Sequence, residues 1–358
     1  MKELGVAVIG AGNIGSLRAH LLARMPQVRF LAVADVVEER AQTLARQCQA
    51  DLASDNIQEV IGHQAVDAVI IATSEQEHVA PALATVELRK PVLIEKPLAM
   101  TLPDADRILE AARGSGSEVL VGFTQRFRRR YLVTKDQVSR GVIGNVVSLF
   151  GKIYLNKMVA ELVISRSPTT TPSVNTLTYL ADLVLWYLED KRPVKVYAQS
   201  GYFVFKKRYN APDFTWVTVT FDDGTVANLG VSWLIPEKHP AYIATMELEL
   251  FGTEGMLSVD DSHRDFMLVP GQRTHQLDMV PPIDIAFMGS SMPGDWALGE
   301  FWGPMRDETE SFIAHLTTGR PTPVATGEQG RRALELTLAA DRSASEGVPV
   351  ELPLKEPV

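Results

Sequence analysis

The sequence predicts an α/β protein in two parts. Residues 1–124 are predicted to form a doubly wound parallel sheet, and residues 125–358 a mostly antiparallel sheet with a few helices on one side. Three observations support this: short apolar runs alternate with helical patterns in the first third, a glycine-rich turn follows the first run, and longer strand-like runs begin near residue 145. A length of 358 residues also suits two domains.

The first third reads as alternating strands and helices. Apolar runs rich in β-branched residues, which suit strands buried on both faces, are Leu4–Ile9, Arg29–Ala34, Val66–Ala72, Pro91–Ile94 and Val119–Phe123. The helix-like stretches between them are Gly15–Arg24, Glu38–Gln47, Glu77–Glu87 and Leu102–Arg113. Because β-α-β units cross over with the same hand, this order predicts a parallel sheet with helices on both faces.

The pattern of apolar residues changes after about residue 145. Longer strands are predicted at Val146–Leu155, Val194–Phe205, Trp216–Phe221, Thr225–Trp233, Thr245–Phe251 and Met256–Val259. Only one strong helix, Ser173–Leu188, interrupts them, and a last amphipathic helix is predicted over Gly327–Ser345.

Composition narrows the class of protein. The chain has 35 Lys and Arg against 44 Asp and Glu, a formal net charge of −9, so it has no basic surplus for nucleic acid or an anionic membrane. A single cysteine, Cys48, excludes an internal disulfide and a cysteine-rich zinc site, and we interpret it as a core or helix-surface thiol. The seven histidines show no paired spacing, so we predict no metal site. With no signal-peptide pattern and no long apolar run, we expect a soluble, cytoplasmic protein.

A dinucleotide-binding turn is predicted between the first strand and the first helix. Gly10, Gly12 and Gly15 have the required spacing, with Asn13 and Ile14 opening the helix whose free N–H groups would face a pyrophosphate. Asp35 ends the second predicted strand, 35 − 15 = 20 residues after the last glycine, where a ribose-binding carboxylate belongs. That carboxylate would repel a 2′-phosphate, which favours NAD and leaves NADP as the alternative. A merely tight β-α turn is the alternative to a cofactor site.

Several further motifs give the chain a family resemblance. In order, these are Ala72-Thr73-Ser74 with His78, Glu95-Lys96-Pro97, Gly122–Phe127, Gly141–Gly144, Asp182–Trp186, Phe251–Gly255 and Arg331–Glu335. Together with the glycine turn, they make the chain resemble the glucose–fructose oxidoreductase/inositol dehydrogenase/rhizopine catabolism (Gfo/Idh/MocA) oxidoreductases over most of its length.

The resemblance implies a Rossmann domain followed by an α/β domain whose open-faced sheet often makes oligomer contacts, here a homodimer or homotetramer. It implies hydride transfer between a nicotinamide and a carbinol carbon, with Lys96 catalytic. An ammonium beside the reacting oxygen would stabilise alkoxide charge and help relay its proton; a surface ion pair with Glu95 is the alternative. Cofactor contacts are implied for residues within the motifs, namely Thr73, Ser74, His78, Glu95 and Gln125. A structural hydrogen bond is the alternative for His78.

The sequence departs from the family pattern on the predicted helix. Most members carry Asp-x-x-x-His where this chain has Asn175 and Tyr179, two positions that share a helical face. Some members have tyrosine there, which implies that Tyr179 donates a proton to a ketone or accepts one from an alcohol. The alternative for Tyr179 is packing against the sheet. Asn175 is expected either to contact the substrate or to stabilise the N-terminus of the helix.

The remaining substrate candidates are residues at positions where family members contact their substrates, or cleft residues of suitable chemistry: Arg126, Lys152, Tyr154, Arg166 and Trp233. A structural role is the alternative for Arg126. The sequence thus predicts an NAD(P)-dependent oxidoreductase acting on a small sugar, sugar derivative or cyclitol. A dehydrogenase of non-sugar ring dihydrodiols and a non-catalytic NAD(P)-sensing regulator are the alternatives.

Overall fold

A computed structural model describes residues 3–241, 243–272, 284–289 and 293–355, which form two compact units. The first unit contains the described residues up to Arg128 together with Trp296–Leu334, and the second contains Arg129–Asp295 and the residues from Glu335 onward. The sequence predicted a single boundary after residue 124, whereas the first unit also takes up a segment from near the end of the chain.

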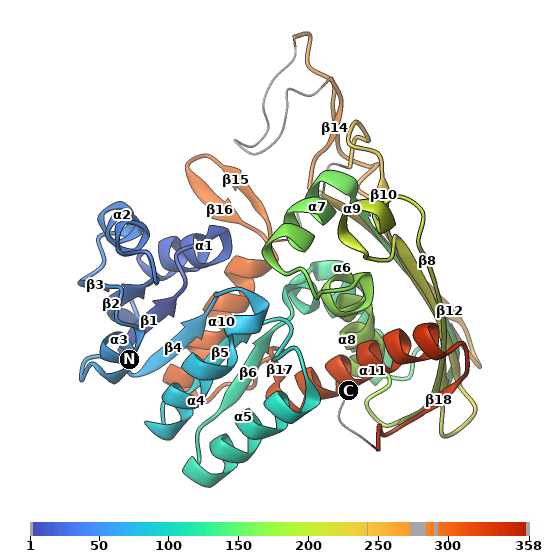
Figure 1. The fold of residues 1–358 in the computed structure, drawn as a ribbon, viewed down its shortest axis with the longest axis horizontal. Helices are drawn as coiled ribbons and strands as arrows, with labels where there is room; N and C mark the ends of the chain where they lie inside the picture. Colours follow the sequence, from blue (N-terminus) through green and yellow to red (C-terminus); the bar gives the residue numbers. More distant parts are fainter. Residues whose placement is uncertain (1–2, 242, 273–283, 290–292, 356–358) are drawn as a thin grey trace. The chain divides into compact units, whose positions relative to one another are not determined.

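A seven-stranded sheet organises the first unit (Figure 1). Its strands are, in spatial order, β17 (Ala325–Thr326), β6 (Val119–Gly122), β5 (Val92–Glu95), β4 (Ala68–Ile71), β1 (Leu4–Ile9), β2 (Val28–Ala34) and β3 (Leu52–Ser54). The six strands from the first third pair in parallel, and β17 adds an antiparallel edge. The order reverses between β1 and β4, as in dinucleotide-binding folds. The predicted doubly wound parallel sheet is therefore confirmed.

Helices cover both faces of this sheet. They are α1 (Asn13–Leu22), α2 (Glu38–Cys48), α3 (Ile57–Gly62), α4 (Val79–Glu87), α5 (Leu102–Ser115) and α10 (Pro304–Thr318), with the short 3₁₀ turns η1 (Glu75–Glu77) and η2 (Thr124–Phe127). On one face α1, α2 and α10 bury apolar side chains such as Ala19, Leu44 and Phe312 against the strands. Cys48 is a free, buried thiol in this core.

The second unit is built on another seven-stranded sheet. Its order is β12 (Met256–Asp261), β11 (Ala244–Gly252), β7 (Val146–Asn156), β10 (Val226–Ile235), β9 (Phe214–Phe221), β8 (Pro193–Gly201) and β18 (Val350–Glu351). Only β7 and β10 pair in parallel, which confirms the mostly antiparallel sheet.

Two smaller sheets pair β13 (Met267–Leu268) with β14 (Ala286–Phe287), and β15 (Asp295–Ala297) with β16 (Glu300–Trp302).

Helices lie on one face of the second sheet. They are α6 (Arg129–Ser139), α7 (Lys157–Arg166), the π-helical segment η3 (Ser173–Leu177), α8 (Thr178–Tyr187), α9 (Lys206–Tyr209) and α11 (Gly327–Glu346), whose first residues belong to the first unit. Gly151 of β7 faces Leu180 of α8, so this side is the inner face. The sequence predicted one strong helix among the strands, whereas α7 and the short α9 also lie between them.

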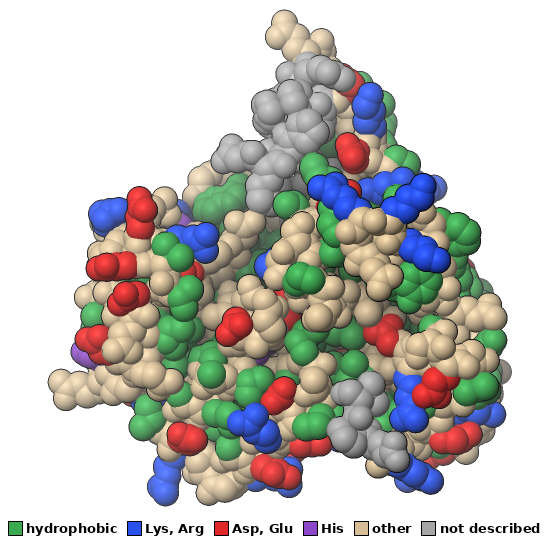
Figure 2. All heavy atoms as spheres, in the orientation of Figure 1, with side chains coloured by type: hydrophobic (Ala, Val, Ile, Leu, Met, Phe, Trp, Pro, Cys, Tyr) green, Lys and Arg blue, Asp and Glu red, His purple; other side chains and the backbone are tan. Residues whose placement is uncertain are grey.

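Acidic and basic side chains are interspersed over the face shown in Figure 2, and Lys and Arg gather over α7 and α9. Three of the four residues of α9 are basic, and one of them, Arg208, pairs with Glu161 of α7 at 3.6 Å. Within the described ranges, no helix is long and apolar enough to cross a membrane.

Candidate cofactor and active site

The glycine turn has the backbone geometry of a phosphate cradle. Gly10 has a φ of +100°, and a Cβ there would lie 2.6 Å from the carbonyl oxygen of Ala72. A Cβ on Gly15 would lie 1.8 Å from the carbonyl oxygen of Gly10. Gly12, in contrast, has nothing within 4 Å of its Cβ position, and it precedes α1 with no side-chain cap. The N-terminus of α1 therefore leaves room for an anion beside Gly12, where the helix dipole favours negative charge.

Asp35 holds this turn from the end of β2. Its carboxylate is 8% exposed and accepts hydrogen bonds from the backbone N–H of Ala11 at 2.8 Å and of Val37 at 2.9 Å. Each oxygen retains acceptor capacity, because a carboxylate oxygen can accept more than one bond. A hollow of about 520 Å³ lies beside it, lined by Ala11, Ser16, Val37, Glu39, Arg40, Thr43, Leu44 and Gln47. This hollow fits the adenosine end of a dinucleotide.

Two buried polar atoms lie beyond the carboxyl ends of β4 and β6, the strands on either side of β5. The Oγ1 of Thr73, after β4, and the Oε1 of Gln125, after β6, have no hydrogen-bond partner among the described residues. Buried polar atoms without partners are rare, and they mark a site where a polar ligand binds. Ser74 follows Thr73 and precedes η1. In open parallel sheets, ligands bind along this edge, so the residues present fit a nicotinamide dinucleotide.

Lys96 directly follows the last residue of β5, Glu95, and its side chain is half-buried. Next to it, the Nδ1 of His78 donates to the carbonyl oxygen of Pro97 at 2.8 Å. Burial lowers the pKa of His78, which keeps the imidazole neutral in the pH range near 7. A neutral histidine thus fastens the turn from which Lys96 projects.

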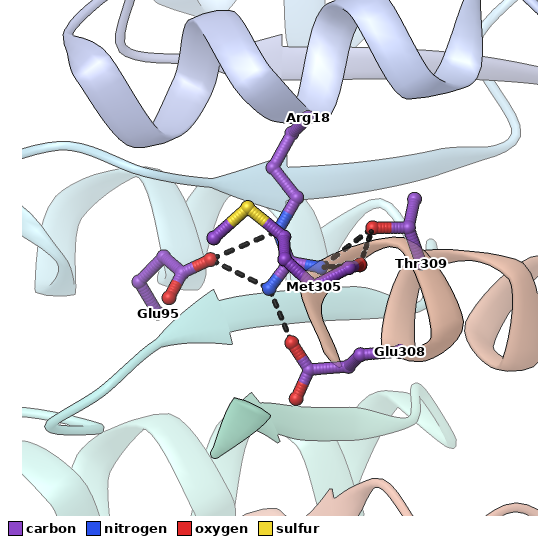
Figure 3. A network of polar contacts seen from close by, with 5 residues as sticks. All are labelled: Arg18, Glu95, Met305, Glu308 and Thr309. Atoms are coloured by element: carbon purple, nitrogen blue, oxygen red, sulfur yellow. Dashed lines mark hydrogen bonds and ion pairs between the residues drawn. The ribbon is translucent and has the colours of Figure 1, made fainter. Parts of the chain in front are cut away.

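Sequence reasoning missed a buried charge network on the other side of β5 (Figure 3). The guanidinium of Arg18 on α1 donates to Glu95 through Nε at 3.0 Å and Nη2 at 2.7 Å, and Nη2 also pairs with Glu308 of α10. Its Nη1 donates to the hydroxyl of Thr309 at 2.7 Å and to the carbonyl of Met305 at 3.3 Å. A signal was available, since Arg18 interrupts the apolar stripe that also contains Gly15, Ala19 and Leu22.

The predicted Arg126 lies in the first unit but is only 2% exposed. Its guanidinium donates to the carbonyl of Pro323 at 3.3 Å and to the Oε1 of Gln329 at 2.9 Å. These bonds fasten η2 to the segment that contributes β17. The structural alternative for Arg126 thus describes its contacts better than substrate binding does.

The helix that carries Tyr179 begins with a π-helical turn, a departure from the regular helix expected over 173–188. Asn175 lies within this turn, is 5% exposed, and donates its backbone N–H to the carbonyl of Thr171 at 3.0 Å. The hydroxyl of Thr171 donates to the Oδ2 of Asp341 at 2.6 Å and accepts from the N–H of Val174 at 3.1 Å. Tyr179 follows on α8 and is half-buried. Single π-turns inside helices occur frequently at functional sites.

Trp233 supports this turn from β10 and does not face solvent. Its side chain has 0% exposure, and its Nε1 donates to the Oγ1 of Thr176 at 2.8 Å. The bond to Thr176 gives Trp233 a structural role, and a substrate contact by Trp233 stays a prediction.

Lys152 and Tyr154 lie on the outer face of the second sheet, opposite the face that packs on α8. Lys152 pairs with Glu247 at 2.9 Å, which raises its pKa, and its ammonium lies 5.7 Å from the centre of the Tyr154 ring. Tyr154 in turn packs edge-on against Trp216. The structure does not bring these residues together with Tyr179, and Arg166 is exposed at the end of α7.

Among the described residues, no group of three or more His, Cys, Asp or Glu side chains could hold a metal ion. The donor set of the first unit consists of backbone N–H groups, hydroxyls, an amide and a carboxylate, which suits a dinucleotide.

Comparison with known proteins agrees with this geometry. The chain is 24% identical over 362 residues to the myo-inositol 2-dehydrogenase of Thermotoga maritima, covering 97% of this chain and 98% of that one. It is also 24% identical to the scyllo-inositol 2-dehydrogenase (NAD(+)) of Bacillus subtilis, covering 99% and 97%. The crystal structure of scyllo-inositol dehydrogenase from Lactobacillus casei with NAD(H) and scyllo-inositol matches with a TM-score of 0.77 at 15% identity, over 98% of this chain and 99% of that one. At that identity the match shows the shared fold.

Two family models match the chain almost end to end. Residues 4–123 match the NAD-binding Rossmann fold of the GFO_IDH_MocA oxidoreductase family, and residues 135–352 match the C-terminal alpha/beta domain of the same family. The chain therefore belongs to the Gfo/Idh/MocA oxidoreductases, with an NAD-binding Rossmann fold at its N-terminus.

Proposed function

We propose that the protein transfers hydride between NAD and the secondary alcohol or ketone carbon of a sugar, sugar derivative or cyclitol, with Lys96 and Tyr179 handling the proton. One observation carries most of this proposal. Lys96 follows β5 at the carboxyl edge of the sheet, the edge that also holds the glycine turn, Thr73 and Gln125. When bound, NAD supplies the hydride acceptor for alcohol oxidation, and its reduced form supplies the donor for ketone reduction.

The two proton-handling groups have complementary chemistry. An ammonium at Lys96 would stabilise the alkoxide charge that develops on the reacting oxygen. Pro97 disfavours a helical conformation at position 96, and His78 holds the carbonyl of Pro97, so the turn is supported on both sides. Tyr179 offers a phenol, whose ordinary pKa of about 10 suits proton donation at neutral pH.

The preference for NAD over NADP rests on Asp35. A carboxylate there accepts hydrogen bonds from ribose hydroxyls and repels a 2′-phosphate. The residues that follow it, Val36-Val37-Glu38-Glu39, are exposed and bring no cation, and Arg40 is the first one after them.

A polyol is the substrate class we propose, because the relatives named above are inositol dehydrogenases. Asn175 supports this, since its amide can both donate to and accept from a hydroxyl. The ring-dihydrodiol dehydrogenase and the cofactor-sensing regulator remain as outcomes of the substrate test below.

We also propose a homodimer or homotetramer formed through the outer face of the second sheet. Several exposed apolar side chains lie on that face, and two of them, Phe251 and Met256, are cross-strand partners; the others are Phe150, Tyr197 and Trp216. Gly230 makes room for the Trp216 ring, because a Cβ at Gly230 would lie 1.9 Å from it. Exposed apolar patches of this kind mark interfaces. The cytoplasmic location stays a prediction.

The test is a substrate panel of sugars, inositols and aromatic dihydrodiols assayed with NAD and NADP by absorbance of the reduced nicotinamide. We expect turnover with NAD and at least one polyol, and loss of that turnover in Lys96→Ala with the affinity for NADH retained. Turnover of dihydrodiols alone would show that ring dihydrodiols, and not polyols, are the substrates. Tight NADH binding without turnover of any compound in the panel would favour a cofactor-sensing regulator over an enzyme.

A further inference from the structure

The network around Arg18 places two carboxylates on one guanidinium away from water (Figure 3). The side chains of Arg18 and Glu308 are 0% exposed, and that of Glu95 is 13% exposed. Arg18 stays protonated, because a guanidinium does not lose its proton in proteins. The free oxygen of Glu308, Oε1, is buried and has no hydrogen-bond partner in the described part of the chain. The carboxylate of Glu308 therefore lacks a hydrogen-bond partner for one of its oxygens when it is ionised.

Further charged and titratable groups act on this network from η2, β5 and the segment around His78. Arg126 of η2 lies close enough to lower the pKa of Glu308, and Glu95 of β5 raises it. On the far side of Glu95, His78 is neutral and has Glu75 as a neighbour. Burial dominates over these charges and raises the pKa of Glu308 to about 7. The network thus changes its charge by one unit near neutral pH.

Counting the two arginines and two carboxylates, the cluster is neutral when Glu308 is ionised and carries one positive charge when Glu308 is protonated. Glu95 belongs to both this cluster and the active-site turn, because Lys96 is its next residue. The side chains of Arg18, Glu95 and Glu308 lie largely away from water, where charges are screened little.

We propose that Arg18 and Glu308 are positioning residues that set the protonation of Lys96 electrostatically, through Glu95. This inference rests on the proposed function, in which Lys96 handles the proton, for its catalytic meaning. Ionised Glu308 adds a negative charge near Lys96 and favours the ammonium, the form that stabilises an alkoxide. Protonated Glu308 leaves an excess positive charge near Lys96 and favours the neutral amine.

Competitive acetylation tests this without a substrate. The full-length chain is treated with trace acetic anhydride between pH 5.5 and 9, and peptide mass spectrometry gives the labelling rate of Lys96 relative to the exposed Lys207 of α9. The variants are Glu308→Gln, Arg18→Met and, as a matched control, Thr309→Val. Thr309→Val removes a hydrogen bond to Arg18 but no charge.

The variants are expected to change the rate by different amounts. At pH 8, Glu308→Gln should label Lys96 roughly three- to tenfold faster than the unchanged protein. Arg18→Met should label Lys96 at about the unchanged rate, because buried Glu308 takes up a proton when the guanidinium is lost, so one positive and one negative charge disappear together. At pH 5.5, where Glu308 is already neutral in the unchanged protein, Glu308→Gln should have little effect. Thr309→Val should match the unchanged protein throughout.

A purely structural network would loosen the turn in each variant and move the labelling rate in one direction. Equal shifts in Glu308→Gln and Thr309→Val, or a Glu308→Gln shift of the same size at pH 5.5 and pH 8, overturn the proposal. If Arg18→Met does not fold, Glu308→Gln and Thr309→Val decide alone. Failure of the proposed function would be seen separately, as absence of turnover in the substrate panel, because labelling requires no substrate.

Discussion

Lys96 and Tyr179 are supported by different kinds of interaction. Behind Lys96, the buried guanidinium of Arg18 holds Glu95 and Glu308. Behind Tyr179, the π-turn is held by bonds between neutral donors and acceptors, such as Trp233 to Thr176, and by the bond from Thr171 to the carboxylate of Asp341. The first support is electrostatic, whereas the second depends on packing and hydrogen-bond geometry.

This difference predicts different sensitivities. A charge change near β5 should alter protonation while the fold persists, since Coulomb interactions act without contact. A shape change around η3 should alter where the helix begins, since hydrogen bonds act only at short range and near-linear geometry. The following variants test the contrast, from the largest expected effect to the smallest.

Tyr179→Phe should lower kcat by about 10²- to 10⁴-fold with little change in stability, because it removes only the hydroxyl proposed to handle the proton. Steady-state kinetics and thermal denaturation measure the two effects. Tyr187→Phe on the same helix is the matched control: its buried hydroxyl donates to the carbonyl of Tyr131 at 3.1 Å, so its loss should lower stability by about 1 kcal/mol and leave kcat unchanged. Near-normal turnover in Tyr179→Phe would remove Tyr179 from the mechanism.

Gly12→Ala should weaken NADH binding by about 100-fold while the melting temperature stays within about 2 °C of the unchanged protein. Gly12 has a φ of −75° and open space around it, so the protein tolerates a methyl group that a pyrophosphate would not. Gly10→Ala is the counterpart, because its φ of +100° and the nearby Ala72 carbonyl should cost stability directly. Fluorescence titration with NADH checks affinity, and equal affinity in Gly12→Ala would contradict the cradle.

Asp341→Asn probes the carboxylate that accepts from Thr171 next to the π-turn. Burial raises the pKa of Asp341 to about 6, and the hydrogen bond from Thr171 opposes the shift. A raised folded-state pKa means that the ionised form destabilises the fold, so this cost grows as pH rises from about 4 through 6. Allowing for its partial exposure, the asparagine variant should be more stable by about 1.5 kcal/mol at pH 8 and unchanged near pH 4. Chemical denaturation at both pH values measures this, and equal differences at the two would contradict it.

Trp233→Phe should show the smallest effect. It removes the hydrogen bond to Thr176 and keeps an aromatic ring in the core, so the free energy of unfolding should fall by about 1 kcal/mol or slightly more. The register of the π-turn should loosen, which hydrogen exchange of residues 173–179 would detect. If the exchange rates of these residues are the same in Trp233→Phe as in the unsubstituted protein, Trp233 does not hold the turn.

Local patterns allowed much of the fold to be predicted. β1 spans the predicted Leu4–Ile9, and the glycine turn follows it. The three-residue β3 and the six-residue α3 carry too little periodicity to be read. Segment 296–334 returns to the first unit through packing between distant residues, which no local pattern encodes.

The candidate site was less predictable than the fold. The motifs named Lys96 and Tyr179, but the π-turn depends on partners such as Trp233, which lies 233 − 176 = 57 residues from Thr176. Arg18 and Glu308 are 308 − 18 = 290 residues apart, and the only local signal for either is a charge within an apolar helical stripe. Sequence reasoning also placed Lys152 and Tyr154 in the site, because it could not show on which face of the sheet they lie.

We propose that Lys96 and Tyr179 handle the same proton. A double-mutant cycle is the most direct test of this proposal. Rates of NADH formation are compared for the unchanged protein, Lys96→Met, Tyr179→Phe and the double variant, with the best polyol of the panel. Residues that act as a unit are strongly non-additive, so the double variant should be about as slow as the slower single variant. Rate losses that multiply in the double variant would show that the two residues act independently and would contradict the account.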